Sequence, residues 1–535
     1  MSEFILAYDI GTTGVKTCLF EVGEKIDLIA YASRGYNQYI LDNGGAEQDP
    51  EEWWGGMAES TAEVLAEAKH VKPDMISGIA FCSQMQGLVL VDKDGNALRR
   101  PMSYMDQRAI KEIKKGMSNG VQIAGANVTK LMPSLKITGA VAGSVKDPVW
   151  KYKWVEANEP EIFSKVYKWL DVKDYLILRC TGNFTATEDS AFGTFLYDIR
   201  PETRGWSDEM CNILGVNREH LPEVINSTDV AGKLSAKAAA DLGLAEGTPV
   251  FGGGGDASLI GVGAGAVEAG DTHIYSGTSG WVGTITKKPV TDVTSMIAAM
   301  PGADPEKYVY FAEMETAGKC LEWVRDHLAK DEIGIYINKE GVSPDFEERS
   351  SSLYSYMMES IKDVEPGSSG VLFAPWLHGN RCPFEDSASR GMFIGIGLET
   401  GKTELIHAVL EGVFYHLRWM LESQGKRVKT SKSVRFVGGG ALSDVSCQML
   451  ADIIGRPVET VEYPQNVGSV GACAVAAVGL GLISSIDSIK DFVQVSKTFE
   501  PDKEKNEAYK PYFKTFKKLY SANKGIFAQL TKAEY

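Results

Sequence analysis

The chain has 535 residues, of which 44% are hydrophobic and 24% charged. At roughly 150 residues per domain, this length predicts two to four domains, and the composition excludes a wholly disordered chain. Lys and Arg together number 55 against 71 Asp and Glu, so the net charge is −16 and no overall basic surface for nucleic acid or acidic lipid is expected.

The cysteines and the longest apolar run indicate the compartment in which the protein works. Eight cysteines are scattered without a C-x-x-C or other metal-ligand spacing, so we expect reduced, mostly buried thiols in a cytoplasmic protein. Residues 1–10 lack the basic segment and cleavage site of a secretory leader. The longest apolar run, 470–482, is too short to span a membrane and is interpreted as a buried helix.

Glycine clusters mark the turns of the predicted fold. The chain holds 56 glycines, above the usual share of about 7%, and they gather at 252–255, 261–270, 277–280, 391–397 and 438–440. Between these clusters, short β-branched or aromatic runs alternate with amphipathic stretches such as 51–68 and 402–421. This alternation predicts an α/β fold.

Two hairpins with similar turns indicate a duplicated domain. Residues 4–22 have the pattern of a strand, a tight turn at 11–14 and a second strand, and residues 272–286 repeat this plan around a turn at 277–280. Either hairpin alone is explained equally well as an ordinary turn, because short motifs recur by chance. Together they predict two copies of one domain with a cleft between them.

The first turn carries groups that suit phosphate. Its glycines let backbone N–H groups approach a phosphate, Thr12 and Thr13 add donors, and Lys16 adds a positive charge. Asp9, which ends the preceding strand, is a candidate to hold Mg²⁺ through water. The turn at 277–280 offers the same donors, so two turns facing each other would hold a polyphosphate from both sides.

Neither of the two commonest nucleotide motifs is present in full. A Walker A match at 401–403 fails because Ile396 stands where glycine is required, and the segment 438–443 meets G-x-G-x-x-G only approximately. Gly439 and Gly440 nevertheless lie between a predicted strand and a predicted helix. They would let a nucleoside lie against the backbone, although by themselves the residues favour a simple tight turn.

Asp256 is the sharpest single candidate for catalysis. It follows a predicted strand and the glycines 252–255, and it precedes a helix-like run of small residues, 257–265. An aspartate at such a place most often caps a helix, and taken alone this interpretation is favoured. The functional alternative is a general base kept ionised by the helix dipole, with the glycines leaving room for substrate.

Polar side chains of the first half suit a polyol. They follow a predicted strand and a hairpin at 88–98, and they are Gln84, Met85, Gln86, Tyr104, Asp106 and Arg108. Amide and charged groups beside an aromatic ring and a methionine fit an uncharged polyol, which needs directional hydrogen bonds and one apolar wall. Ordinary loop polarity explains the same residues equally well.

Taken together, these residues resemble the FGGY family of carbohydrate kinases, within the actin-like ATPase superfamily. The resemblance covers about residues 4–480. It is strongest at 391–396 and 404–411, which fit the family's carboxy-half signature throughout. The amino-half signature is only partly present: the residues that fit are Pro148, Lys151, Tyr152 and Trp154, and those that depart are Lys146 and Ala157.

The resemblance implies two RNase H-like domains with ATP and Mg²⁺ in the cleft between them. It matches Asp9 with the metal-associated aspartate and Asp256 with the catalytic base, and it matches Asp106 and Arg108 with a family motif in which Tyr104 replaces tryptophan. The predicted ATP-binding residues are Gly11, Thr12, Thr13, Lys16, Gly277, Thr278, Ser279, Gly439 and Gly440. The predicted domains are 1–255 (sugar and first phosphate turn), 256–482 (ATP) and a helical extension, 483–535.

The sugar is less well defined than the reaction. Gln84, Met85 and the Gly-Gly-Gly-Asp run resemble the xylulose kinase branch, but Gln86 stands where that branch has histidine and Ala257 where it has asparagine. From the branch resemblance we expect ATP-dependent phosphorylation of a ketopentose such as D-xylulose, with another pentulose, an alditol or a sugar acid as the alternative. The two departures predict that D-xylulose itself is a weak substrate or that a related polyol is preferred. A rival from another class is an actin-like switch or a sugar sensor without phosphotransfer.

The expected partners follow from this interpretation. We predict a small sugar or polyol as substrate, no nucleic acid, no membrane, and assembly as a homodimer.

Overall fold

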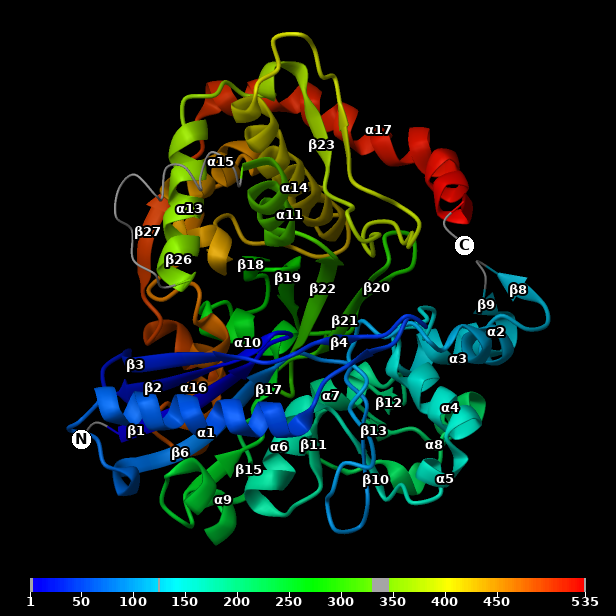
Figure 1. Cartoon of the computed structure of the whole chain (residues 1–535), viewed down its shortest axis with the longest axis vertical. Coiled ribbons are helices and arrows are strands. Elements are labelled where there is room, and N and C mark those ends of the chain that lie inside the picture. Colours follow the sequence, from blue (N-terminus) through cyan, green and yellow to red (C-terminus); the bar gives the residue numbers. More distant parts are fainter. Residues whose placement is uncertain (1–2, 124–125, 330–345, 534–535) are drawn as a thin grey trace.

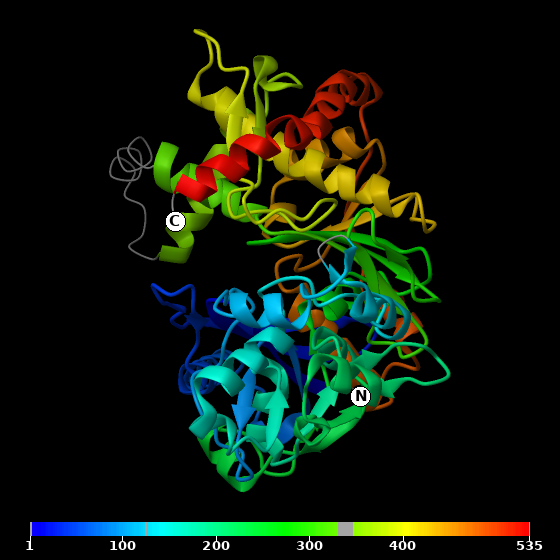
Figure 2. The same ribbon diagram turned by 90° about the vertical axis from the view of Figure 1, so that its right-hand side faces the viewer.

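A computed structural model describes residues 3–123, 126–329 and 346–533, in which two mixed sheets each form the centre of one lobe (Figures 1 and 2). The first sheet has the strand order β15-β16-β6-β1-β2-β3, with β17 also paired to β6. Its strands are β1 (Glu3–Ile10), β2 (Gly14–Val22), β3 (Ile26–Gly35), β6 (Ile76–Ser83), β15 (Val230–Lys233), β16 (Pro249–Phe251) and β17 (Gly254–Gly255).

The second sheet has the strand order β20-β21-β22-β19-β18-β25-β26-β27. Its strands are β18 (Thr272–Ser276), β19 (Gly280–Thr286), β20 (Thr291–Asp292), β21 (Ile297–Pro301), β22 (Tyr308–Met314), β25 (Val434–Val437), β26 (Val458–Val461) and β27 (Val495–Phe499). The lobe around this sheet is called the second lobe below, and the lobe around the other sheet is called the first.

The two sheets share one plan, which confirms the predicted duplication. In the first sheet β1 is antiparallel to β2, β2 is antiparallel to β3, and β1 is parallel to β6. In the second, β18 is antiparallel to β19, β19 is antiparallel to β22, and β18 is parallel to β25. Both predicted hairpins are therefore present, each as the first two strands of its sheet.

Helices cover the sheets through apolar faces. Helix α1 (Pro50–Glu67) begins where the Asp49 side chain accepts a hydrogen bond from the Glu51 N–H, and Pro50 suits the first helical position. Its Trp53, Met57 and Val64 are buried in the core of the first lobe. In the second lobe α14 (Lys402–Gln424) lies against β19, β22 and β23 (Leu372–Ala374).

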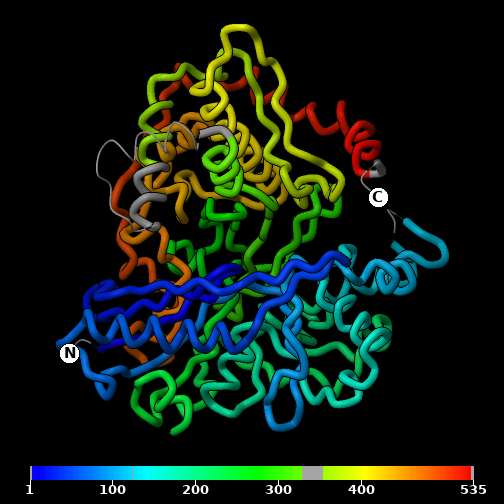
Figure 3. Tube along the Cα trace, in the orientation of Figure 1, coloured from blue at the N-terminus to red at the C-terminus, as the bar shows by residue number. Residues whose placement is uncertain are grey.

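One late helix returns to the first lobe. Helix α16 (Val467–Gly479) packs on β1 and β6, although it follows the strands of the second sheet in the sequence (Figure 3). It also crosses α10 (Asp256–Gly263) at glycines: a Cβ on Gly263 would lie 1.9 Å from the Val467 carbonyl oxygen. This explains the small residues of the run 470–482. The buried helix predicted for that run is confirmed up to residue 479, where α16 ends, and residues 480–482 lie beyond it.

The segment 483–535 differs in part from the helical extension expected for it. It contributes β27, which pairs with β26 at the edge of the second sheet, before α17 (Lys503–Ala533) begins. The helix buries Tyr509, Phe513 and Phe516 in the core of the second lobe. The strand was missed because its side chains are mostly exposed and lack the alternation that marks a half-buried strand.

Two further expectations can be compared with the structure. All eight cysteines are buried and unpaired, as predicted. Within the described ranges, none of the helices has the length and apolar character needed to cross a membrane. The division of the chain at residues 255 and 256 stays a prediction.

Candidate active site

The first turn connects the strands of the first hairpin and lies beside the returning helix α16. The Gly11 N–H donates to the Gly14 carbonyl at 2.9 Å and closes the turn, and Asp9 lies opposite Lys16 in the strand register. The Lys16 ammonium donates to the Gln465 carbonyl at 2.8 Å, just before α16. In this structure Lys16 therefore ties the hairpin to α16, and its predicted phosphate contact stays a prediction.

Asp9 lies against the first turn of α16. A Cβ on Gly468 would lie 2.9 Å from Asp9 Oδ2, so only glycine allows this approach. Burial raises the pKa of Asp9, while Lys16 and a hydrogen bond with the Cys82 thiol lower it. The carboxylate thus sits close to a helix N-terminus and one lysine, a place where a further positive charge would stabilise its ionised form.

The second turn is fastened by a short helix. Its Gly277 N–H donates to the Ser279 carbonyl at 3.0 Å, and the carbonyl of Gly277 accepts from the Gly318 N–H at 2.7 Å. Gly318 begins α11 (Gly318–Val324), and the Thr278 carbonyl accepts from the Ala317 N–H at 3.0 Å. The conformation of this turn is therefore fixed by backbone hydrogen bonds.

The glycines predicted to lie against adenosine pack beside the second turn. Gly438 has φ of 92° and donates to the Pro464 carbonyl at 2.7 Å, which bends the chain directly after β25. A Cβ on Gly440 would lie 2.9 Å from the Cβ of Ser276, the residue before the second turn. Gly439 faces open space, because no atom lies within 4 Å of its would-be Cβ. The structure thus brings these two predicted ATP segments together.

Hydrogen bonds join the first turn to the predicted sugar residues. Thr12 Oγ1 donates to the Tyr104 hydroxyl at 3.3 Å, and the Thr12 carbonyl accepts from Gln48 Nε2 at 2.6 Å. Gln48 Oε1 in turn accepts from Gln84 Nε2 at 2.8 Å. Gln84 Oε1 is buried and has no hydrogen-bond partner among the residues that the structure describes, so it is available to a hydroxyl group. Sequence reasoning missed Gln48, since a single glutamine belongs to no motif.

The backbone of Gln86 is held from both sides. Its φ of 63° is uncommon for a residue with a side chain. Its N–H donates to Asp171 Oδ2 at 2.9 Å, and its carbonyl accepts from the Lys151 ammonium at 2.7 Å. Both partners are buried, and Lys151 is one of the residues that fit the amino-half signature. These contacts fix the loop that presents Gln86.

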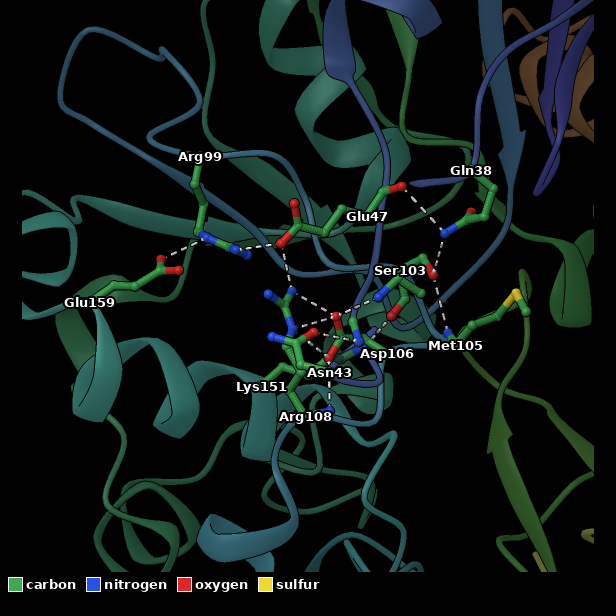
Figure 4. A network of polar contacts seen from close by, with 12 residues as sticks. Gln38, Asn43, Glu47, Arg99, Ser103, Met105, Asp106, Arg108, Lys151 and Glu159 are labelled. Atoms are coloured by element: carbon green, nitrogen blue, oxygen red, sulfur yellow. Dashed lines mark hydrogen bonds and ion pairs between the residues drawn. The ribbon is translucent and has the colours of Figure 1, made fainter. Parts of the chain in front are cut away.

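Asp106 and Arg108 form one buried network (Figure 4). Asp106 is fully buried, and its Oδ2 accepts from the Ala46 N–H at 2.9 Å and from Arg108 Nη2 at 2.7 Å. Glu47 Oε1 accepts from Arg108 and from Arg99, each at 2.6 Å. Asp106 therefore orients Arg108, and a direct contact of Asp106 with substrate stays a prediction.

Asp256 is the first residue of α10, and Gly255 before it is the N-cap, so the capping interpretation is wrong. The Asp256 carboxylate accepts from the Ala257 N–H at 2.8 Å. Burial, together with the charges of Asp9, Glu313 and Asp171, raises its pKa to about 8. The helix dipole therefore does not keep this group ionised at neutral pH, in contrast to the expectation. A buried carboxylate with a raised pKa is typical of a general base.

The glycines before Asp256 do not leave room for substrate. A Cβ on Gly253, whose φ is 61°, would lie 2.2 Å from the Phe81 carbonyl oxygen, and one on Gly255 would lie 2.3 Å from Met85 Sδ. The space is filled by the protein itself, so the expectation of an open approach at these glycines is wrong. The glycines instead let the chain pass closely over β6 before it enters α10.

The comparison with protein families decides the identity. The N-terminal domain of the FGGY family of carbohydrate kinases matches residues 4–263, and its C-terminal domain matches residues 273–480. The chain belongs to this family. It is therefore a carbohydrate kinase, as the resemblance predicts.

Relatives of this kinase include xylulose kinases and gluconokinases. It is 31% identical over 537 residues to the xylulose kinase of Lactococcus lactis subsp. lactis (strain IL1403), which spans 99% of each chain. It is 28% identical over 526 residues to the xylulose kinase of Bacillus subtilis (strain 168), 98% of each chain. It is also 28% identical over 534 residues to the gluconokinase of Bacillus licheniformis, 99% of this chain and 98% of the relative.

Solved structures show the same fold. The ligand-bound xylulose kinase from Lactobacillus acidophilus superposes with a TM-score of 0.83 at 25% identity, over 99% of this chain and 100% of that one. The gluconate kinase from the same organism gives 0.82 at 24% identity, with the same coverage. The two predicted RNase H-like domains of the actin-like ATPase fold are thereby confirmed.

Charged residues of this kinase that no motif marks connect the lobes near Asp256. Lys146, which precedes helix α4 (Pro148–Asn158) of the first lobe, donates to Glu315 of the second at 3.0 Å, and Arg381 donates to the same carboxylate at 2.9 Å. Glu313 lies 3.6 Å from Arg381. The charges of both glutamates help to raise the pKa of Tyr104, so they act on the predicted sugar site.

Ala257, one of the two departures from the xylulose kinase pattern, lies in an apolar surrounding. It is buried in a small cluster with Ile285, Met300 and Val309 of the second sheet. Methionine Met85, predicted to form an apolar wall, packs against the same cluster. The alanine that stands at position 257 in place of asparagine therefore contributes to the packing between α10 and the second lobe.

Proposed function

We propose that this kinase transfers the γ-phosphoryl group of ATP to a hydroxyl group of a neutral ketopentose such as D-xylulose. The single observation that carries the proposal is the position of Asp256 at the start of α10, where it is buried and within electrostatic reach of Asp9 of the first lobe and Glu313 of the second. Burial first, and then these two charges, raise its pKa. A carboxylate that lies close to charged residues of both lobes is well placed to act as a base on a substrate bound between them.

In the proposed reaction Asp256 accepts the proton of the substrate hydroxyl as its oxygen attacks the γ-phosphorus. The backbone N–H groups and hydroxyls of the turns 11–14 and 277–280 stabilise charge on the transferring group. Gln84 and Gln86 offer amide groups to sugar hydroxyls, and Tyr104 lies beside Thr12 at the junction of the sugar and phosphate regions.

The residues present fit a hard divalent cation. Like charges meet at this place, because Asp9, Glu313 and Asp171 all help to raise the pKa of Asp256, while Lys16 is a cation that lowers the pKa of Asp9. We propose that Asp9 holds Mg²⁺ through water. When bound, the ion neutralises phosphate charge.

Charge favours a neutral sugar over a sugar acid, although gluconokinases are among the relatives. Both cations of the cross-lobe cluster, Lys146 and Arg381, are already paired with Glu315. The charges of Glu313 and Asp171 act on Asp256 and make the site more negative. A substrate carboxylate would add like charge to it, which is unfavourable at close range.

The test is ADP formation with D-xylulose, D-ribulose, xylitol and D-gluconate, each over a range of concentrations. The proposal expects a higher kcat/KM for a ketopentose than for gluconate. A preference for gluconate would overturn the neutral-sugar proposal, and ADP release that no sugar accelerates would contradict phosphotransfer itself. A cytoplasmic location and a homodimer stay predictions, as does the absence of nucleic-acid and membrane partners.

A further inference from the structure

Asp189 is a buried carboxylate to which the proposed mechanism gives no part. It lies in α7 (Glu188–Gly193) of the first lobe and is 2% exposed. Its Oδ1 accepts from the Thr187 hydroxyl and from the Ser190 N–H, the latter at 2.8 Å. Its Oδ2 accepts from the Gly255 N–H at 2.7 Å and from the Ser258 hydroxyl. Both oxygens therefore accept two hydrogen bonds each.

The two contacts of Oδ2 lie on either side of Asp256 in the sequence. Gly255 is the N-cap of α10, and Ser258 is in its first turn. Ser258 Oγ also lies 3.0 Å from the Gly255 carbonyl oxygen, so the cap and the first turn lie close together. A Cβ on Gly254 would lie 3.0 Å from Asp189 Oδ2, which shows how closely the chain passes this carboxylate.

The element that carries Asp189 is itself anchored. Glu188, the neighbouring residue, accepts from the Tyr197 hydroxyl at 2.8 Å and from Arg204 Nη1 at 3.1 Å. The position of Asp189 is therefore set by contacts outside α10. Through Asp189, the N-terminus of α10 is held at a fixed place relative to β17 and the first sheet.

We infer that Asp189 is a positioning residue that fixes the direction of the Asp256 carboxylate; the inference rests on the proposed role of Asp256 as base. A misplacement of a reacting group by about 1 Å can cost roughly 10²-fold in rate. Asp189→Asn replaces one acceptor oxygen by an NH₂ group, which meets donors on both sides. With the NH₂ group toward Gly255 and Ser258, the first turn of α10 must shift, and with it Asp256. With the NH₂ group toward Ser190, α7 must shift and carries the side chain at 189 with it.

The test measures kcat and KM for ATP in Asp189→Asn, Asp256→Asn and the double variant, with Asp198→Asn as the matched control. Asp198 is also buried in the first lobe, and it accepts from Arg200 and Thr203, away from α10. We expect kcat of Asp189→Asn to fall by roughly 10²-fold, with KM for ATP unchanged. The double variant should be no slower than Asp256→Asn, because Asp189 acts through Asp256.

Each outcome decides between positioning and general support of the fold. The inference would be overturned if the fold-decreases in kcat of the two single variants multiply in the double variant. It would also be overturned if Asp189→Asn and Asp198→Asn have equal kcat. If Asp256→Asn turns over like the parent, the proposed base fails and the inference with it; if Asp256→Asn is slow while Asp189→Asn is not, only the inference fails. Should Asp189→Asn not fold, Ser258→Ala removes one of the two hydrogen bonds of Asp189 Oδ2, and a parental kcat there would overturn the inference.

Discussion

The two hairpins share one backbone plan but differ in the residues around their turns. In the first lobe the strands present Asp9 opposite Lys16, beside the N-terminus of α16. In the second lobe the corresponding strands present Tyr275 opposite Trp281, whose rings stack at 4.0 Å. Duplication supplied the same turn twice, and only the first copy carries the charges that the proposed reaction needs.

This difference indicates that the two hairpins have different roles in the proposed reaction, although their backbones share one plan. The second turn is fixed by the backbone groups of α11 and packs beside Gly440, so it suits a purely hydrogen-bonding role toward nucleotide. The first turn adjoins Asp9, Tyr104 and, through Gln48, the predicted sugar residue Gln84. The proposed function therefore shares phosphate binding between the lobes and assigns the sugar and the metal to the first.

The largest expected effect on kcat comes from a substitution of Asp256, which lies close to charges of both lobes. Asp256→Asn keeps the shape of the side chain but removes the base, so kcat should fall by roughly 10² to 10⁴-fold. KM for ATP should remain near the parent value, because the turns are unchanged. Steady-state ADP release measures both quantities. Comparable kcat values in variant and parent would show that Asp256 is not the base.

The next effect is on the Mg²⁺ dependence of the rate, which should differ between variants of the two hairpins. Asp9→Asn should raise the Mg²⁺ concentration needed for half-maximal rate by roughly 10- to 100-fold, because the amide cannot attract the ion as a carboxylate does. Tyr275→Phe changes the corresponding strand position of the second lobe and should leave the Mg²⁺ dependence as it is. Equal shifts of the half-maximal Mg²⁺ concentration in the two variants would contradict the proposed difference between the hairpins.

A smaller effect tests the donor role of the second turn. Thr278→Val removes one hydroxyl and should raise KM for ATP roughly tenfold, the loss of one hydrogen bond to a charged group. Thr286→Val, at the far end of β19, is the control with the same chemical change. If both variants keep the parental KM, the side chain at 278 takes no part in nucleotide binding.

The smallest effect is a shift of pH dependence. A base with a pKa of about 8 requires deprotonation, so kcat/KM should rise with pH and reach half its maximum near pH 8. Glu313→Gln removes a charge that raises this pKa, and the half-maximum should therefore move to lower pH. Glu59→Gln, on the exposed face of α1, should leave the profile unchanged. A shift to higher pH in Glu313→Gln would contradict the electrostatic coupling.

Much of the scaffold could be predicted from the sequence, because its signals are local. The turn glycines and the alternation around them predict both hairpins, and the carboxy-half signature predicts the family. The contact of α16 with the first sheet could not be predicted, since it depends on tertiary packing that no local pattern encodes. The strand β27 was missed for lack of alternating burial.

The candidate site was predictable where residues belong to a motif and not elsewhere. Asp9, Asp256 and the turn residues follow from strand ends and glycines. Gln48 and Asp189 are single polar residues whose partners lie 36 and 66 positions away, so only the folded chain shows what they do. The glycines before Asp256 misled the prediction, because their purpose is close packing against Phe81 and Met85.

The central claim is that the turns 11–14 and 277–280, from opposite lobes, hold one nucleotide. A crystal structure with a non-hydrolysable ATP analogue and Mg²⁺ tests it most directly. The account predicts phosphate oxygens within hydrogen-bond distance of backbone N–H groups of both turns, with adenosine beside Gly439 and Gly440. Phosphates that contact one turn only, or a nucleotide bound outside the cleft, would contradict it.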